Sequence, residues 1–149
     1  MTRRVHVGLG DRSYDVVVGA GAVSQLASLV PSSVRRIALI TQTGVPVDVG
    51  GQLPKGVSVS RHVVGNGEEH KTLATIERLC GEFAAAGITR SDMVIGVGGG
   101  MTTDVAGFAA ASWHRGIRVV HVSTTLVGMI DAAIGGKTGV NIEIGRAHV

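Results

Sequence analysis

Short apolar runs recur along the chain, and glycines, prolines or polar residues separate them. Runs that alternate or stay apolar over a few residues predict strands, whereas apolar positions three and four residues apart predict helices. The segment Gln42–Gly56 is broken by glycine and proline and has no clear pattern. The pattern predicts a hairpin of Val5–Leu9 and Tyr14–Val18, a helix Val23–Val30, strands Arg36–Thr41 and Val57–Val64, a helix Thr72–Ala86, a strand Met93–Val97, a helix Thr103–Ser112 and a strand Val119–Ser123.

The two longer predicted helices differ in the width of their apolar surface. In Thr72–Ala86 the residues Leu73, Ile76, Cys80 and Phe83 form one stripe, so one face packs on the core and Cys80 is a small core residue. Thr103–Ser112 is apolar nearly all round and should be buried on both sides. Strands alternating with such helices predict a single α/β unit, with a Rossmann-like parallel sheet, flanking helices and an N-terminal β-hairpin.

Composition narrows the class of protein. Apolar residues make up 44% of the 149, enough for a real core. The net charge of +3 is scattered and aromatic residues are only 3%, so a nucleic-acid partner is not expected. No apolar run is long enough for a membrane span or a signal peptide, and Cys80 is the only cysteine, so we expect a cytoplasmic location and no membrane partner.

A glycine triplet, Gly98–Gly100, follows the predicted strand Met93–Val97. It does not match the G-x-G-x-x-G dinucleotide fingerprint, but it meets the same need: backbone N–H groups can approach a pyrophosphate at the positive end of the next helix. The triplet could equally be a tight turn. Asp104 could complement the helix dipole, or it could accept hydrogen bonds from a ribose or a nicotinamide amide.

Polar loops elsewhere offer further ligand groups, each with a structural alternative. Asn66–Lys71 is either a solvated capping segment or a loop in which Glu68 accepts from ribose hydroxyls and Lys71 pairs with phosphate. Thr124-Thr125 follows a strand and is either an N-cap or a pair of ligand hydroxyls. Lys137 lies in a glycine loop where a lysine has little structural purpose, which favours a functional role. Asp131 lies in an apolar run and should face a partner or a ligand.

The six histidines do not form a metal motif. No two of them have the H-x-x-x-H spacing, and none adjoins a cluster of carboxylates in the sequence. The sequence therefore predicts no metal ligands in this chain.

Together these segments resemble the N-terminal part of 3-dehydroquinate synthases. The resemblance extends in order and spacing over Gly65–Asn141, and the earlier strands are compatible with it. Its motifs are G-E-x-x-K (Gly67–Lys71), G-G-G followed by D-x-A-G-F-x-A-A (Gly98–Ala111), Arg115-Gly116, T-T-L (Thr124–Leu126) and D-x-x-x-G-G-K-T-G-V-N (Asp131–Asn141).

The resemblance implies a homodimeric lyase that uses NAD and a divalent metal, zinc or cobalt. Such enzymes convert the phosphorylated sugar acid 3-deoxy-D-arabino-heptulosonate 7-phosphate to 3-dehydroquinate and phosphate, in the shikimate pathway of aromatic amino acid biosynthesis. The implied catalytic residues are Lys137, Asp131 and Arg115. Arg115 would contact the substrate phosphate, either in its own copy or across the interface of the dimer. The implied cofactor contacts are Asn66, Gly67, Glu68, Glu69, His70, Lys71, Gly99, Gly100, Met101, Thr102, Thr103, Asp104, Thr124, Thr125 and Lys137.

The chain departs from the family pattern in several places. Thr103 stands where glycine is common, and Ser123 where proline is common. The family's zinc ligands, a glutamate and two histidines, lie in a C-terminal helical domain that this chain lacks. We therefore expect an NAD-binding domain at residues 1–141 and a non-matching tail at 142–149. Glu143–Val149 matches one reading frame of a common sequencing-adapter oligonucleotide, so we expect an artefactual tail, which the source reading frame would check.

Two other readings stay open. One is a related enzyme with the same glycine turn, either a sugar-phosphate cyclase of the 2-deoxy-scyllo-inosose synthase type or a glycerol-dehydrogenase-like oxidoreductase. The motif G-G-K-T-G-V-N argues against the oxidoreductase and only weakly against the cyclase. The other is a non-catalytic NAD-binding remnant. In every case we expect the isolated chain to be inactive, because it has no ligand set for a metal.

Overall fold

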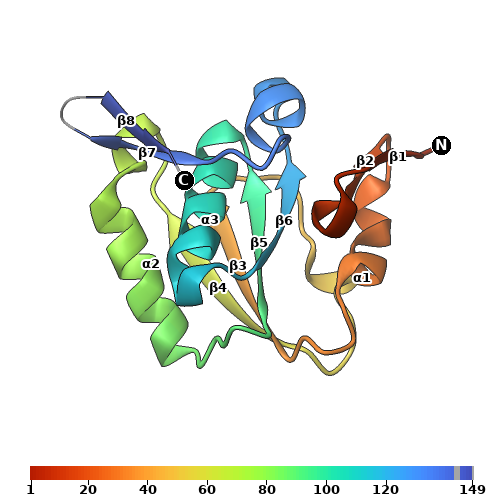
Figure 1. Cartoon of the computed structure of the whole chain (residues 1–149), viewed down its shortest axis with the longest axis horizontal. Helices are drawn as coiled ribbons and strands as arrows, with labels where there is room; N and C mark the ends of the chain where they lie inside the picture. Colours follow the sequence, from red (N-terminus) through yellow and green to blue (C-terminus); the bar gives the residue numbers. More distant parts are fainter. Residues whose placement is uncertain (143–144, 149) are drawn as a thin grey trace.

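The computed structural model describes residues 1–142 and the backbone of residues 145–148. A four-stranded parallel sheet forms its centre, in the order β4-β3-β5-β6 (Figure 1). The strands are β3 (Arg36–Gln42), β4 (Ser58–Val64), β5 (Met93–Gly98) and β6 (Arg118–Ser123), close to the predicted ranges. The predicted α/β class with a parallel sheet is confirmed.

Helices cover the sheet on both faces. On one face lie α2 (Leu73–Ala85) and α3 (Gly100–Ser112), and on the other lies the short α1 (Leu26–Leu29), which follows the 3₁₀ turn η2 (Ala22–Gln25). Each face has its own core. Ile40, Val94, Phe83 and Val105 belong to the core under α2 and α3, whereas Ile37 and Ile95 face the side of α1. Five of the six residues of β3 after Arg36 are buried, as expected of a strand covered on both faces.

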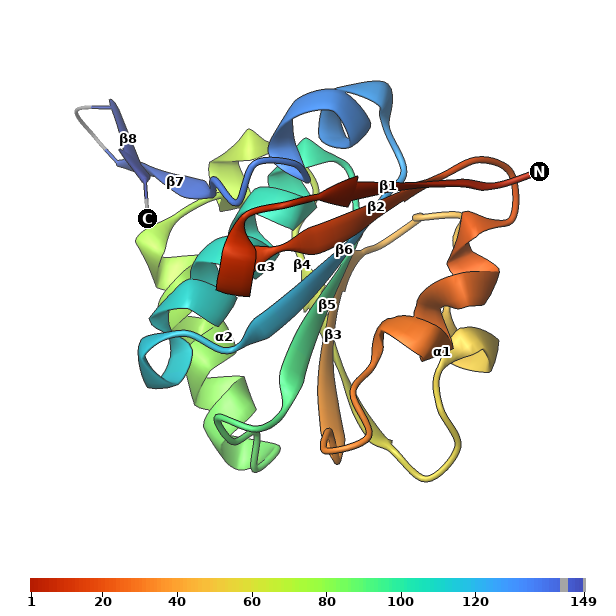
Figure 2. The same cartoon turned by 45° about the vertical axis from the view of Figure 1, so that its right-hand side comes forward.

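Two small antiparallel sheets flank the central one. The predicted N-terminal hairpin is confirmed as β1 (Arg3–Val7) and β2 (Tyr14–Val18), which lies in front of β6 in Figure 2. A second pair, β7 (Gly139–Ile142) and β8 (Gly145–His148), was not predicted, and it includes backbone of the expected tail. Glu143, Ile144 and Val149 lie outside the described residues. The remaining one-turn helices are η1 (Gly10–Arg12), η3 (Gly50–Gln52), η4 (Glu68–His70), η5 (Trp113–Arg115) and the π-helical η6 (Gly128–Ala132).

Two helix predictions need correction. The helix expected from Thr103 begins at Gly100, so Thr103 and Asp104 lie one turn inside it. The predicted stripe of the other helix is wrong at Leu73, the first residue of α2, whose exposed fraction is 53%. The buried residues of α2 are Ile76, Leu79 and Phe83, with Cys80 half-buried beside them; burial raises the pKa of that thiol.

The contact between α3 and β5 depends on a small residue at Gly96. A Cβ atom built there would lie 2.6 Å from Cβ of Ala106, which is closer than two carbons approach. We expect Gly96→Ala to lower the free energy of unfolding by about 1–3 kcal/mol, because a rigid helix would have to move off the sheet. Urea unfolding would measure it. Gly81→Ala in α2 is the control, since nothing lies within 4 Å of its added methyl, and it should stabilise slightly.

Candidate functional site

The carboxyl ends of the parallel strands meet at one edge of the sheet, where the predicted ligand segments gather (Figure 1). The chain leaves β3 toward β4 on one side and leaves β5 toward β6 on the other, so the strand order reverses between β3 and β5. Open α/β sheets bind ligands in the crevice at such a switch point. Gln42 ends β3 and Gly98 ends β5 at this crevice.

The glycine triplet makes a close approach at the start of α3. A Cβ atom at Gly98 would lie 2.5 Å from Oγ1 of Thr102, and one at Gly99 would lie 3.0 Å from Cγ2 of Thr125. Gly99 is the N-cap of α3 and supplies no side-chain cap. The N–H groups of the first turn have no acceptor within the helix, so this end of α3 is suited to an anion.

The next three residues turn their side chains inward. Met101 is part of the core, and Thr102 and Thr103 are fully buried. Thr103 Oγ1 donates to the carbonyl oxygens of Gly99 and Gly100 at 3.3 and 3.0 Å. Any cofactor contact from these residues must therefore come from their backbone.

Gln42 is a site residue that the sequence reasoning missed. Its Oε1 accepts a hydrogen bond from Thr102 Oγ1 at 2.6 Å, and its Nε2 donates to the carbonyl oxygen of Gly65 at 3.2 Å. It thus joins the end of β3 to the first turn of α3 and to the loop after β4. The available signal was a polar residue directly after the predicted strand Arg36–Thr41, at the end where ligand groups gather.

An ion pair joins the loop after β4 to α3. Lys71 Nζ pairs with Asp104 Oδ2, and the exposed side-chain fractions are 3% for Lys71 and 17% for Asp104. The sequence suggested a phosphate as the partner of Lys71. In the structure, the ammonium group of Lys71 is paired with the carboxylate of Asp104 instead. The pair leaves Asp104 with its negative charge balanced and its remaining oxygen able to accept a hydrogen bond.

The segment after the glycine-lysine turn closes the same cluster. Asn141 donates from its backbone N–H to the carbonyl oxygen of Lys71 at 2.7 Å, and its Nδ2 lies 3.3 Å from both the carbonyl oxygen and Oε2 of Glu68. Thr138 Oγ1 donates to the carbonyl oxygen of Asp104. Segments near residues 68, 104 and 138 are therefore in direct contact.

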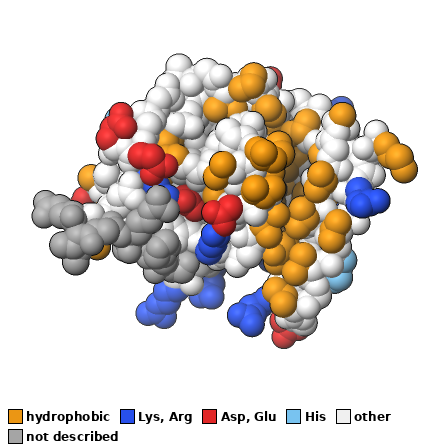
Figure 3. Space-filling model, turned by 90° about the horizontal axis from the view of Figure 1, so that it is seen from above, with side chains coloured by type: hydrophobic (Ala, Val, Ile, Leu, Met, Phe, Trp, Pro, Cys, Tyr) orange, Lys and Arg blue, Asp and Glu red, His pale blue; other side chains and the backbone are white. Residues whose placement is uncertain are grey.

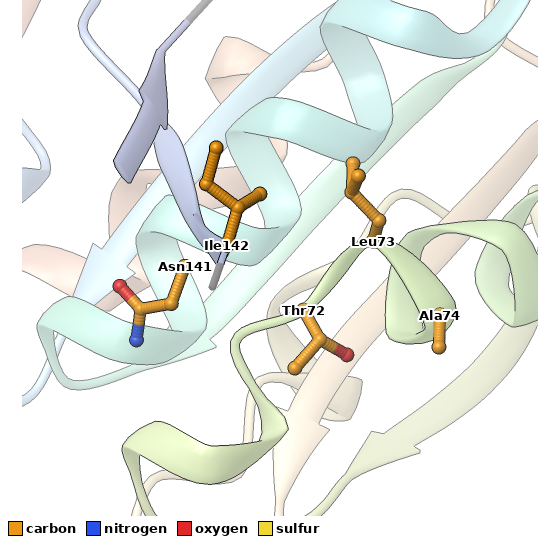
Figure 4. A pocket seen from close by; sticks show the side chains of 5 residues that line it. All are labelled: Thr72, Leu73, Ala74, Asn141 and Ile142. Carbon is orange, nitrogen blue, oxygen red and sulfur yellow. The ribbon is translucent and has the colours of Figure 1, made fainter. Parts of the chain in front are cut away.

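Beside this cluster lies a shallow groove between α2 and β7. Its walls come from Thr72, Leu73 and Ala74 on one side and from Asn141 and Ile142 on the other (Figure 4). The aliphatic side chains of Leu73 and Ile142 make most of it apolar. It adjoins Glu68 through Asn141, so it lies at the outer end of the same edge.

Lys137 and Asp131 form a second ion pair, which is exposed. Lys137 Nζ contacts Asp131 Oδ1, and more than half of each side chain is accessible. The expectation that Asp131 faces a partner is met by Lys137. The apolar run around it is not buried, however: Leu126, Val127, Met129 and Ile130 are exposed large apolar residues. Hydrophobic side chains gather on the face of the molecule seen in Figure 3.

The remaining candidate residues of the loop after β4 either pack against glycines of the same loop or are exposed to solvent. A Cβ atom at Gly65 would overlap the ring of His70, and one at Gly67 would overlap the carboxylate of Glu69. Asn66 is exposed, and Thr125 Oγ1 accepts from the backbone N–H of Gly128 at 3.2 Å. The backbone N–H of Thr124 donates to the carbonyl oxygen of Gly98 at 2.9 Å, which holds the two strand ends together.

Arg115 is not brought to this cluster. It follows α3 at the end opposite Gly100, about 20 Å away for a helix of this length. His114 and Arg115 both have left-handed backbones, with φ of 49° and 65°, a strained conformation for residues with a Cβ. Within this chain Arg115 therefore lies apart from the cluster at the start of α3.

His121 is a half-buried polar residue close to Asp104. It lies on β6 under α3, and its Nδ1 has no hydrogen-bond partner within the described part of the chain. Burial lowers the pKa of His121, although the carboxylate of Asp104 opposes the shift. The imidazole is therefore neutral at pH 7. Among the described residues, no group of three or more His, Cys, Asp or Glu side chains could hold a metal ion.

Comparison with known proteins decides the family. The family model described as 3-dehydroquinate synthase N-terminal matches residues 61–149. The chain belongs to this family.

Curated relatives agree with this family over nearly the whole chain. A protein of Amycolatopsis mediterranei with the provisional name aminodehydroquinate synthase is 45% identical over 98% of this chain, and a 3-dehydroquinate synthase of Streptomyces avermitilis is 41% identical over 96% of it. The chain spans only 41% of the length of each relative. It is thus similar to their N-terminal part.

Solved structures in the same group of synthases carry ligands. A 2-deoxy-scyllo-inosose synthase complexed with carbaglucose-6-phosphate, NAD⁺ and Co²⁺ matches 97% of this chain with a TM-score of 0.87 and 30% identity. A 2-epi-5-epi-valiolone synthase of Streptomyces hygroscopicus with NAD⁺ and Zn²⁺ matches 91% with a TM-score of 0.73 and 32% identity. The chain covers 41% and 39% of them, and the family resemblance inferred from the motifs is confirmed.

Proposed function

We propose that this chain is the NAD-binding part of a 3-dehydroquinate synthase. The observation that carries the proposal is the contact between three segments far apart in sequence: Glu68–Lys71, the first turns of α3 at Asp104, and Thr138–Asn141. These are three of the motif segments, and they meet at the switch point of one sheet. The NAD⁺ bound to the two synthases of known structure supports the choice of cofactor.

The residues of this chain fit such a cofactor. The unpaired N–H groups at the start of α3 and the glycines before it would hold the pyrophosphate, since no Cβ blocks the approach. Glu68 and Gln42 would accept from ribose hydroxyls, and Asp104, paired with Lys71, would accept from the carboxamide. Thr124 and Thr125, which follow β6, would line the cofactor on the side opposite Glu68. When bound, NAD would supply transient oxidation of a substrate hydroxyl.

The reaction and the remaining ligands extend beyond this chain. We propose that the complete protein eliminates phosphate from 3-deoxy-D-arabino-heptulosonate 7-phosphate in the cytoplasm, with Lys137 and Asp131 contacting the substrate. The described residues do not fit the divalent metal, so its ligands would come from the part of the relatives that this chain does not span. No helix among the described residues is long and apolar enough to cross a membrane.

The position of Arg115 supports a dimer. Because Arg115 lies at the end of α3 opposite Gly100, we propose that it contacts a substrate phosphate in the site of a second copy. We therefore retain the homodimer and the catalytic role of Arg115 as one joint proposal. Residues 1–141 would form the cofactor domain of each copy.

NAD binding is the direct test. Under saturating NAD, at about 100 times the dissociation constant, the chain should be stabilised by about 2.7 kcal/mol, which differential scanning calorimetry would detect. Asp104→Asn should weaken the binding, whereas Lys55→Met should not, because Lys55 precedes β4 at the opposite edge of the sheet. A chain that aggregates and shows no response to NAD would contradict the proposal.

Catalytic turnover by the isolated chain is tested separately from NAD binding. The purified 149-residue chain should release no phosphate from the heptulosonate, because the metal ligands are not among its described residues. A phosphate-release assay with added zinc or cobalt measures this. Steady phosphate production that depends on the protein concentration would overturn the expectation.

A second candidate is a sugar-phosphate cyclase with another substrate. The TM-score of 0.87 to a 2-deoxy-scyllo-inosose synthase and the provisional name of the 45% identical relative favour it. Assays of the complete parental enzyme on the heptulosonate, its amino analogue and glucose 6-phosphate would separate the three reactions.

A further inference from the structure

The turn that carries Lys137 is held from outside by the N-terminal hairpin. Gly135 and Gly136 have left-handed backbones, with φ of 84° and 66°, and nothing lies within 4 Å of a Cβ built on either. The backbone N–H of Gly135 donates to the hydroxyl oxygen of Tyr14 at 3.2 Å, across 121 residues of sequence. This hydrogen bond joins the sheet of β1 and β2 to the turn that carries Lys137.

Tyr14 is well placed to act as a fixed anchor. It begins β2 and pairs with Val7 of β1, so its backbone is held in the hairpin ladder. The hairpin is itself tied to η2, because Gln25 donates to Thr2 at 2.8 Å and accepts from Arg4 at 2.9 Å. The hydroxyl group therefore has a support in the hairpin, whereas Gly135, which it contacts, and its neighbour Gly136 have left-handed backbones with open space beside them.

We propose that Tyr14 is a positioning residue for Lys137, and this rests on the proposed function of the site. Holding the N–H of Gly135 fixes one end of the Gly135-Gly136 turn, and the turn then directs the ammonium group of Lys137 to Asp131. Without the hydroxyl, two glycines in open space would let the lysine sample many positions. The hairpin thereby contributes to the site although it belongs to another sheet.

Tyr14→Phe removes only the hydroxyl group and is the variant to test. In the full chain, amide hydrogen exchange of Gly135 should become about tenfold faster, and acylation of Lys137 should become about threefold faster because the amine leaves Asp131 more often. Acylation of Lys55 in the same sample should be unchanged. Ser13→Ala is the matched control: it removes a hydroxyl from the same hairpin whose partners, Leu9 and Gly10, lie away from the turn.

A double-mutant cycle on NAD affinity separates positioning from general loss of structure. Isothermal titration with NAD should show about threefold to tenfold weaker binding for Tyr14→Phe, and no further weakening when it is added to Lys137→Ala. Losses that simply add, or unchanged Gly135 exchange and Lys137 acylation, would overturn the proposal. If the parent chain binds no NAD, the proposed function fails, and the exchange and acylation rates still decide the role of Tyr14.

Discussion

Lys71→Met is expected to lower the free energy of unfolding by about 3–5 kcal/mol and to weaken NAD binding at least tenfold. Methionine keeps most of the buried stem of Lys71, but the carboxylate of Asp104 is then left unpaired with only 17% of its side chain exposed. Removing one partner of a buried ion pair has a cost of this size because the remaining charge is poorly solvated. Urea unfolding and isothermal titration would measure the two effects.

The double variant Lys71→Met with Asp104→Asn distinguishes folding from binding. With both charges removed, most of the lost stability should return, but NAD affinity should stay low because the cofactor loses an ionised acceptor. Lys55→Met is the control for losing a surface lysine and should change stability by no more than about 0.5 kcal/mol. A loss below about 1 kcal/mol for Lys71→Met would contradict the importance of the pair.

Asp92→Ala should have the second large effect, at the opposite edge of the sheet. The buried carboxylate of Asp92 accepts from the backbone N–H groups of Arg35, Arg36 and Thr89 at 3.2, 2.9 and 2.8 Å, and from the hydroxyl of Thr89 at 2.9 Å. The variant leaves three backbone donors without a partner, so we expect a loss of roughly 2–4 kcal/mol. Asp48→Ala, which removes one exposed acceptor for Gly50, should lose less than about 1 kcal/mol.

The same residue predicts a pH dependence. Burial by itself raises the pKa of Asp92, but the hydrogen bonds from Thr89, Arg36 and Arg35 outweigh it and hold that pKa below the ordinary value of 3.8. A lowered folded pKa means that the stabilisation is fully present above about pH 4 and is lost as the pH falls through the folded value. Unfolding free energies from pH 7 down to pH 2 should therefore converge for the parent chain and Asp92→Ala. Glu82, whose pKa is also held low by His62 and Arg78 against burial, contributes equally to both proteins.

The sequence predicted the strands well and the helix starts poorly, for a physical reason. A buried parallel strand such as β3 is a run of apolar residues whose limits are visible in the sequence. The start of α3 was placed three residues late because glycine disfavours a helix interior. The observed helix nevertheless includes Gly100, where an added Cβ atom would lie at ordinary contact distance from Val127 and Ala132, in a segment not adjacent in sequence.

The candidate site was predictable as a set of segments but not as a set of contacts. The glycine turns and the polar residues at the strand ends correctly predicted a candidate site at the carboxyl edge of the sheet. The pairing of Lys71 with Asp104 and the contacts of Gln42 join residues 23 to 60 positions apart in the sequence. Hydrophobic periodicity carries no information about such contacts. Leu73 shows the reverse error: its spacing fits the core, but its place at the first turn of α2 exposes it.

The all-round burial of α3 constrains how the molecule can respond to a ligand. Because this helix packs against β5, β6, α2, η6 and β7, shifting it would disturb most of the interior. In the segment Gly128–Gly136, which has a single π-helical turn and two left-handed glycines, only Gly128 and Ala132 are buried. We therefore expect any adjustment to a bound molecule in the exposed residues of this segment rather than in α3.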